Sequence, residues 1–340
     1  MTGLRRESSG RFIAFCMFLC FVESPTECAK FHKILFGSVY YPTYDIISSF
    51  QNKKSMESII QYFNHIPSAH RSAILLGGLT LFMLLETGLP YYREQYSKFR
   101  HLGVNLFFTL TTVLVNFVMA FILLRTSDWA MATHFGVLQW LPEIPLWLYV
   151  LLGLMLLDFI GAYLAHWMEH RVKWMWKFHL VHHTDPNVDA TTANRHHPGE
   201  SVIRFVFTVA AALFAGAPVY LIMLYQSASV ALSQFNHANI RLPHWFDRIA
   251  GLVFVTPGMH RVHHHYVLPY TDTNYGNIFS FWDRLFGTYS TLENDKIRFG
   301  IDTHGASEEK NNIFFMLKIP FQPYRMPVGS KFEGTDGARR

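Results

Sequence analysis

Residues 166–183 read HWMEHRVKWMWKFHLVHH, and residues 260–264 read HRVHH. The first stretch contains a His-x-x-x-His motif followed by a His-x-x-His-His motif, and the second stretch repeats the latter. Side chains three or four residues apart lie on one face of a helix, so the imidazoles of each motif are expected to converge within one turn. Neutral imidazole is the commonest side-chain ligand of transition metals. The two stretches therefore predict a metal site built on helices.

The candidate ligands are the histidines of these motifs. They are His166, His170, His179, His182, His183, His260, His263 and His264. His237 is a further candidate, because it follows an apolar segment that is expected to end near the same face. Of the other histidines, His196 is expected beside the ligands or exposed, and His101 is expected to be an ordinary residue.

The number of histidines bears on the kind of metal. Ligation by nitrogen alone fits zinc or iron, but a closed zinc site takes only four ligands. The zinc-protease pattern His-Glu-x-x-His is absent, since Glu169 does not directly follow His166. Two irons that share the histidines and keep positions open for O2 fit the pattern best.

Apolar segments surround the motifs. Half of the 340 residues are hydrophobic and only 16% are charged, against about one quarter in a typical soluble domain. Segments 73–92, 102–124 and 146–165 are each long enough to cross a bilayer as a helix. Segment 201–235 is apolar as well, but Gly216 and Pro218 interrupt it, so we expect two shorter helices in a hairpin.

The topology follows from charge and from the histidines. The loop 92–101 contains Arg93, Lys98 and Arg100, which favours the cytoplasmic side. The hairpin has to begin and end on that face, because histidines that flank it need to meet. The expected fold is an all-α integral membrane protein with four or more transmembrane or hairpin helices. A cytosolic histidine-rich cap would hold the di-metal site.

The rest of the chain is divided by composition. Residues 1–29 resemble a cleaved signal peptide, although a short anchor helix or a nonfunctional extension is equally compatible. Residues 30–70 carry little signal, 71–295 form the expected enzyme domain, and 296–340 form a C-terminal tail. The three cysteines all precede residue 29, so the body offers neither a disulfide framework nor a cysteine-ligated cluster. The net charge of +5 fits topology and anionic headgroups, and no nucleic-acid groove is expected.

The histidine motifs resemble those of the fatty acid hydroxylase and sterol desaturase superfamily of integral-membrane di-iron enzymes. Stretch 166–183 is similar to the paired first and second boxes of that family, spacing included, and 256–264 is similar to its last box. Segments 195–200 and 272–288 resemble the segment after the second box and the closing signature. The resemblance covers about residues 75–295 and leaves both ends of the chain outside.

The resemblance implies two non-haem irons, with O2 as co-substrate, held by the eight motif histidines and less securely by His237. Arg241 stands where some members have another histidine. Asp158 matches a recurrent family position, where a carboxylate either orients an imidazole or makes a helix-end hydrogen bond. Glu86, inside an apolar segment, is either functional or close to the interface.

The function implied is a membrane-bound, O2-dependent oxidoreductase that hydroxylates or desaturates a lipid, whether a sterol, a fatty acyl or an alkyl lipid. Its electrons are expected from a separate donor protein of cytochrome b5 or ferredoxin type. The membrane would be the endoplasmic reticulum in a eukaryote and the inner membrane in a bacterium, with the active site on the cytosolic face. The alternative is a membrane carrier or sensor of zinc or iron without redox chemistry. A carrier needs ligands along the bilayer midplane, whereas these histidines lie at the ends of apolar segments.

Overall fold

The computed structural model describes residues 53–93 and 96–329. Within these ranges the chain is helical, and its only extended pairings are isolated bridges such as Pro90 with Ile240. The expected signal or anchor at 1–29, the three cysteines and the last residues of the tail lie outside the described part. The all-α fold expected from the sequence is confirmed for the residues described.

Four of these helices are long and apolar enough to cross a membrane, so the protein is an integral membrane protein. They span Ser68–Gly88, Lys98–Gln139, Leu146–Arg171 and Pro198–Ala215. The first comprises α4 (Ser68–Ser72), a π-turn and α5 (Gly78–Gly88), and the third comprises α7 (Leu146–Asp158), a π-turn (Phe159–Leu164) and α8 (Ala165–Arg171). The second helix, α6 (Lys98–Thr133), continues beyond the expected end at residue 124, since it ends only where His134 adopts a left-handed conformation.

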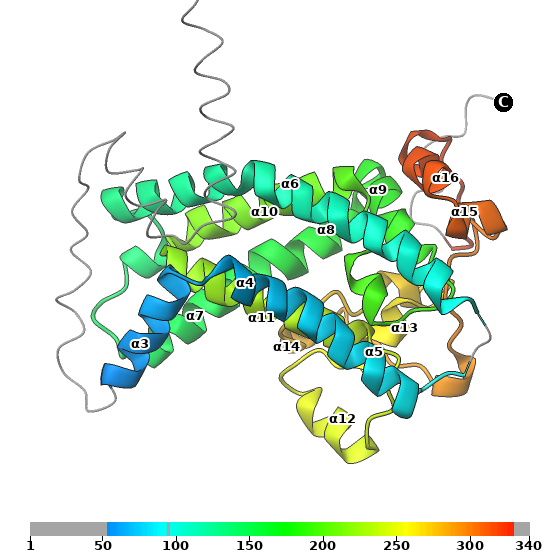
Figure 1. The fold of residues 1–340 in the computed structure, drawn as a ribbon, viewed down its shortest axis with the longest axis horizontal. Coiled ribbons are helices and arrows are strands. Elements are labelled where there is room, and N and C mark those ends of the chain that lie inside the picture. The colour runs from blue at the N-terminus through cyan, green and yellow to red at the C-terminus, as the bar shows by residue number, and fades with distance from the viewer. Residues whose placement is uncertain (1–52, 94–95, 330–340) are drawn as a thin grey trace, which may run out of the picture.

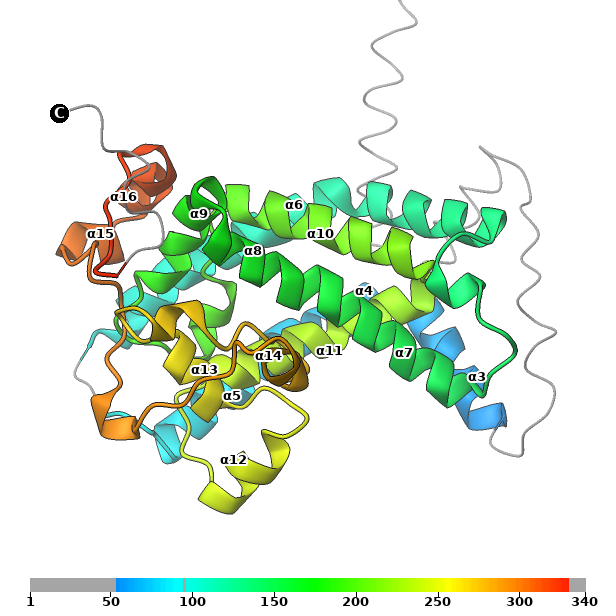
Figure 2. The ribbon, with the colours of Figure 1, turned by 180° about the vertical axis from the view of Figure 1, so that it is seen from behind.

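The expected hairpin is present. Helices α10 (Pro198–Ala215) and α11 (Val219–His237) are joined by Gly216, Ala217 and Pro218. Gly216 has φ +65°, a left-handed conformation that ends α10, and Pro218 then fixes the start of α11. The hairpin therefore returns to the end of the bundle where it began, as Figures 1 and 2 show.

The histidine-bearing helices gather at that end and form a cap (Figure 1). The cap helices are α9 (Lys173–His183), α12 (His244–Ala250), α13 (Pro257–His263), α14 (Phe281–Leu285), α15 (Ser307–Asn311) and α16 (Ile313–Lys318). Helix α3 (Lys53–Asn64) lies at the opposite end of the bundle. Arg241 N donates to Leu89 O and His101 pairs with Asp185, so the ends of α5, α6 and α11 meet at the cap.

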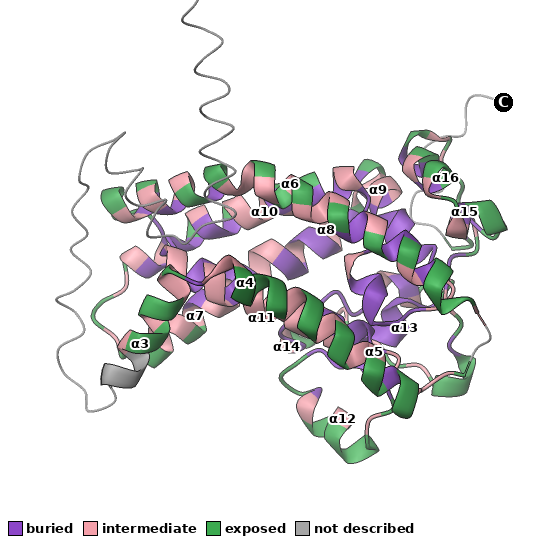
Figure 3. Ribbon diagram, in the orientation of Figure 1, coloured by how far each residue is buried: buried purple, intermediate pink, exposed green. Residues whose placement is uncertain are grey.

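The bundle has a buried core and an exposed apolar outer surface (Figure 3). The bundle core contains Leu157, Leu221 and Ile222, whereas Leu110 and Leu114 on α6 are exposed, as expected of helices that face lipid. Within the expected C-terminal tail, Ile301, Met316 and Ile319 share an apolar cluster with α6 and α9. The described part of this tail is therefore packed against the cap.

The far end of the bundle depends on a close contact between two glycines. Gly136 has φ +112°, and a Cβ added there would collide with the backbone of Gly216. Gln139 Nε2 donates to Gly216 O at 2.7 Å, and Ser127 Oγ donates to Ala217 O at 2.7 Å. These contacts hold the hairpin turn against the end of α6.

We expect Gly136→Ala to lower the free energy of unfolding by at least about 1–3 kcal/mol, because it adds left-handed strain and a backbone collision. Thermal denaturation in uncharged detergent micelles measures the change. Gly103→Ala is the matched control, since a Cβ there meets nothing within 4 Å and the helix gains from alanine. Equal melting temperatures for the two variants would contradict the close contact.

Candidate metal centre

The first group of convergent side chains contains five buried histidines, whose ligand atoms all lie within 4.8 Å of one another. They are His166, His170, His179, His183 and His263. Helix α8 supplies the first two and α9 the next two, each pair four residues apart. Val172 is extended between α8 and α9, and this break lets the two pairs face each other. The final member comes from α13.

The second group contains four buried histidines. They are His182, His237, His260 and His264. His237 closes α11, so the returning arm of the hairpin contributes directly to this group. The structure thus brings together all nine candidate ligands predicted from the sequence.

The three imidazoles of each His-x-x-His-His motif, which were expected to converge within one turn, are divided between the two groups. In α9, His179 and His183 join the five-histidine group while His182 joins the four-histidine group. In the second motif, His260 and His264 join the four-histidine group and His263 joins the five-histidine group. Residues i and i+4 are 40° apart around a helix of 3.6 residues per turn, but i+3 lies on the other side of residue i. Each motif therefore serves both groups.

The nitrogen geometry fits a cation at each point. His179 Nε2 lies 3.1 Å from His166 Nε2 and 3.2 Å from His183 Nε2. His237 Nε2 lies 3.2 Å from His182 Nε2 and 3.0 Å from His260 Nε2. Two nitrogens bound at about 2.1 Å and at right angles to one ion would be about 3.0 Å apart. The two groups can therefore hold one metal ion each.

The protonation of the ligands also fits. His263 Nε2 and His264 Nε2 are buried and have no hydrogen-bond partner in the described residues, so each ring keeps a nitrogen for a ligand. Burial, together with neighbouring histidines, lowers the pKa of His263 and His264 well below the ordinary value. Both rings are then neutral at physiological pH, as metal ligation requires.

Oxygen atoms orient most of the five-histidine group. His166 Nδ1 donates to Tyr275 O at 2.9 Å, and His263 Nδ1 donates to Thr273 O at 2.7 Å. His170 Nδ1 lies 3.1 Å from Asp272 Oδ1. The loop 272–275 therefore fixes three of the five rings so that their Nε2 atoms point inward.

Glu200, in the first turn of α10, orients the fourth ring. Its Oε1 accepts from His179 Nδ1 at 2.7 Å, from His196 Nδ1 at 2.7 Å and from Arg204 Nε at 3.0 Å. The His196 ring also stacks on His182 at a centroid distance of 4.9 Å. His196 thus lies beside the candidate ligands, as expected, and contacts both groups, one through Glu200 and the other through His182.

Asp158 acts on the loop and not directly on an imidazole. Its carboxylate accepts from the backbone N–H groups of Ile278 and Phe279, each at 3.2 Å, and from Trp282 Nε1 at 3.1 Å. Asp283 accepts from Tyr275 N at 2.7 Å in the same loop. The two carboxylates hold the backbone whose carbonyl at Tyr275 orients His166.

A buried polar network beside the histidines was missed from the sequence. His101 Nε2 lies 2.8 Å from Asp185 Oδ2, and the fully buried Arg195 donates to Asn105 Oδ1 at 3.1 Å. A histidine at the start of an apolar helix has no spacing that distinguishes it, so the sequence held no signal for His101. Glu86 Oε1 accepts from Ala190 N at 2.8 Å and Asn239 N at 2.9 Å, so this residue anchors the segment after α9 and the end of α11.

Comparison with known proteins shows which family the histidine-bearing part of the chain is similar to. Residues 150–288, which include every motif histidine, match the model of the fatty acid hydroxylase family. This match and the curated relatives support the resemblance of the chain to the fatty acid hydroxylase and sterol desaturase superfamily. No solved structure matches it significantly.

Three relatives show the range of similarity. The chain is 26% identical to ornithine lipid hydroxylase OlsE of Rhizobium tropici over 64% of its length and 66% of the relative's. It is 30% identical to alkylglycerol monooxygenase of Homo sapiens over 52% of its length and 37% of the relative's. It is 30% identical to a cholesterol 25-hydroxylase-like protein of Danio rerio over 40% of its length and 53% of the relative's. The chain thus spans less than two thirds of each of these relatives.

We expect Glu200→Gln to weaken divalent metal binding at the five-histidine group by about 10- to 100-fold, because the amide no longer holds His179 as a carboxylate does. Metal titration of the purified protein measures this, with Glu293→Gln as a control at an exposed site. The four-histidine group, which Glu200 reaches only through His196, should lose less affinity. Equal affinity in both variants and the parent protein would contradict the orienting role of Glu200.

Proposed function

We propose that this protein is a membrane-bound, O2-dependent oxidoreductase that uses two non-haem irons to hydroxylate or desaturate a lipid. The observation that carries the proposal is the pair of adjacent buried groups, with five and four imidazoles, at the end of an apolar helix bundle. The relatives are lipid hydroxylases and monooxygenases by name, which supports the same chemistry.

In this proposal the five-histidine group holds one iron and the four-histidine group holds the other. Imidazole donors suit both iron and zinc. A closed zinc site takes only four ligands, whereas here two adjacent groups offer nine, and this favours a reactive pair of metal ions. The bound irons would supply O2 activation, which takes two electrons and two protons. In hydroxylation one oxygen atom enters a C–H bond and the other leaves as water. In desaturation two hydrogens are removed and both oxygen atoms leave as water.

The protein residues prepare the site for this chemistry. Glu200 and Asp272 keep a proton on Nδ1 of His179 and His170, so that the deprotonated Nε2 can bind the ion. Asp158 positions the loop that orients His166. The burial of all nine rings excludes bulk water from the reacting oxygen.

The arrangement of the bundle bears on how the substrate reaches the site and on where the electrons come from. The membrane helices end at the histidine groups, so a lipid can reach them from the bilayer; we propose a sterol, a fatty acyl or an alkyl lipid. We also propose that a separate cytochrome b5- or ferredoxin-type protein supplies the electrons. Lys98, Arg100 and Arg171 are exposed at the cap end, which supports a cytosolic active site. The membrane would be the endoplasmic reticulum or a bacterial inner membrane, and residues 71–295 would contain the enzyme domain.

A membrane carrier or sensor of zinc or iron is the alternative. The nine histidines lie together at one end of the bundle and are not distributed along a membrane-crossing path, which disfavours transport. Metal uptake into liposomes by the purified protein, without O2 consumption in the presence of lipid and a reductant, would favour the alternative.

We expect His182→Ala and His263→Ala each to abolish O2-dependent lipid oxidation and to lower the iron content, because each removes a ligand from a different group. Iron analysis of the purified protein and mass spectrometry of the lipids of expressing cells measure the two effects. His65→Ala, at an exposed site on the other end of the bundle, is the control. Full activity in an iron-free protein would refute the proposal.

A further inference from the structure

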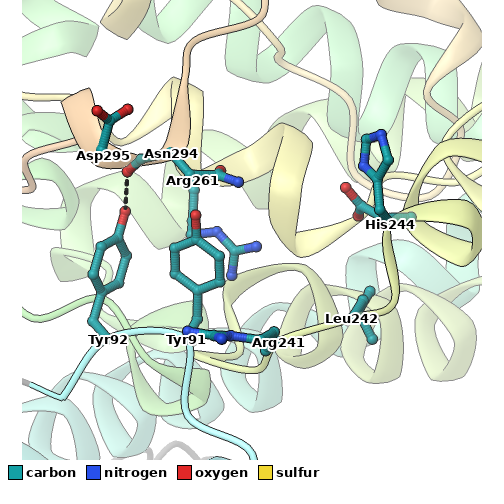
Figure 4. A pocket seen from close by; sticks show the side chains of 9 residues that line it. Tyr91, Tyr92, Arg241, Leu242, His244, Arg261, Asn294 and Asp295 are labelled. Atoms are coloured by element: carbon teal, nitrogen blue, oxygen red, sulfur yellow. Dashed lines mark hydrogen bonds between the residues drawn. The ribbon is translucent and has the colours of Figure 1, made fainter.

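A cavity of about 410 Å³ on the cap is lined in part by Arg261, which lies within the second histidine motif (Figure 4). This volume is within the usual range of about 300–1,000 Å³ for small-ligand sites. Charged and aromatic side chains line it. They include Tyr91, Arg241, His244, Asp247, Arg261 and Asp295. None of these residues belongs to either histidine group.

Arg261 is the central cation of this cavity. It is only 5% exposed, its Cζ lies 3.8 Å from the centroid of the Tyr91 ring, and one Nη1–H donates to Ile240 O at 3.2 Å. Its Nε is buried and has no hydrogen-bond partner in the described residues. A buried guanidinium donor without a partner is costly, so the charge of Arg261 is only partly compensated by the described residues and a nearby anionic group would stabilise it.

Asp247 also has a hydrogen-bond acceptor without a partner in the described residues. Its Oδ1 is buried and has no hydrogen-bond partner in the part of the chain that is described. The carboxylate lies so close to Gly258 that a side chain there would collide with it. With Arg241 and Asp295 the lining carries two formal positive and two formal negative charges. Such a lining fits a ligand that itself carries both charges, and not a simple anion.

The cavity lies next to the end of the first candidate membrane helix. Tyr91 and Tyr92 follow the first membrane helix, which ends at Gly88, and tyrosine is enriched at membrane interfaces. Helix α12 carries Asp247 into the lining while exposing Trp245 and Ile249 by 66% and 62%. A short helix with exposed tryptophan and isoleucine is suited to lie in the interface.

We propose that this cavity binds the zwitterionic headgroup of a lipid, with its phosphate or carboxylate against Arg261 and Arg241 and its ammonium group against Asp247 and Asp295. That the bound lipid is also the substrate rests on the proposed function. It narrows the substrate from sterols, fatty acyl and alkyl lipids to those with a zwitterionic headgroup. Arg261 lies between His260 and His263 on α13, so the headgroup is held by the helix that also carries candidate ligands of both groups.

Binding of soluble short-chain lipids to the full-length protein in dodecyl maltoside micelles tests the proposal without an activity measurement. The probes are dihexanoyl phosphatidylethanolamine, dihexanoyl phosphatidic acid, dihexanoylglycerol and inorganic phosphate, each titrated calorimetrically. We expect phosphatidylethanolamine to bind at least about tenfold more tightly than dihexanoylglycerol, which lacks both charges. Equal affinities of these two lipids, or equally tight binding of inorganic phosphate, would overturn the proposal.

Two variants test the positive and the negative charges of the cavity one at a time. Arg241→Gln should weaken phosphatidylethanolamine and phosphatidic acid alike, whereas Asp247→Asn should weaken only phosphatidylethanolamine, because phosphatidic acid has no ammonium group. Arg248→Gln removes a charge from α12 outside the lining and should change neither affinity. If neither variant alters binding, the lipids bind elsewhere and the proposal is overturned. Because iron is not needed for this binding, an iron-free but headgroup-binding protein would contradict the proposed function alone.

Discussion

Imidazole nitrogens from α8, α9, α11 and α13 come within 4.8 Å of one another in two groups. Metal coordination tolerates errors of only about 0.2 Å in ligand distance, so these four helices have to be placed accurately. The hairpin of α10 and α11 has to turn back at Gly216, because a continuous helix would carry His237 away from His182. The contact of Gly136 with Gly216, at the far end of the bundle, therefore helps to place the candidate metal centre.

Burying nine imidazoles at the end of an apolar bundle would be unfavourable without partners for their second nitrogens. For five of the nine rings the described residues supply such a partner, a carbonyl or carboxylate oxygen. Arg204 Nη2 donates to Glu169 Oε2 at 2.6 Å, and its Nε donates to Glu200, so one guanidinium pairs with both carboxylates behind His179. The buried charges are thus compensated locally, and the cap is held together by a polar network as much as by apolar packing.

The sequence allowed the membrane helices, the hairpin and all nine convergent histidines to be predicted, because each depends on local spacing or composition. The division of each His-x-x-His-His motif between two groups could not be predicted, since it depends on how α9 and α13 are rotated toward each other. The pairing of His101 with Asp185 depends on contact between distant segments. The sequence does not decide whether Asp158 orients an imidazole or makes a helix-end hydrogen bond, because its donors lie in a loop more than a hundred residues later in the chain.

The two groups are not equivalent, and the reason lies in what surrounds them. Four rings of the five-histidine group have an oxygen partner at Nδ1, and two of these oxygens belong to carboxylates. In the four-histidine group His237 Nδ1 donates to Ser233 O at 2.8 Å, whereas Nδ1 of His182 and of His260 has no partner among the described residues. A carboxylate behind an imidazole raises its basicity and fixes its orientation. The five-histidine group is therefore the more strongly preorganised of the two, and the four-histidine group has more freedom to adapt when a ligand binds.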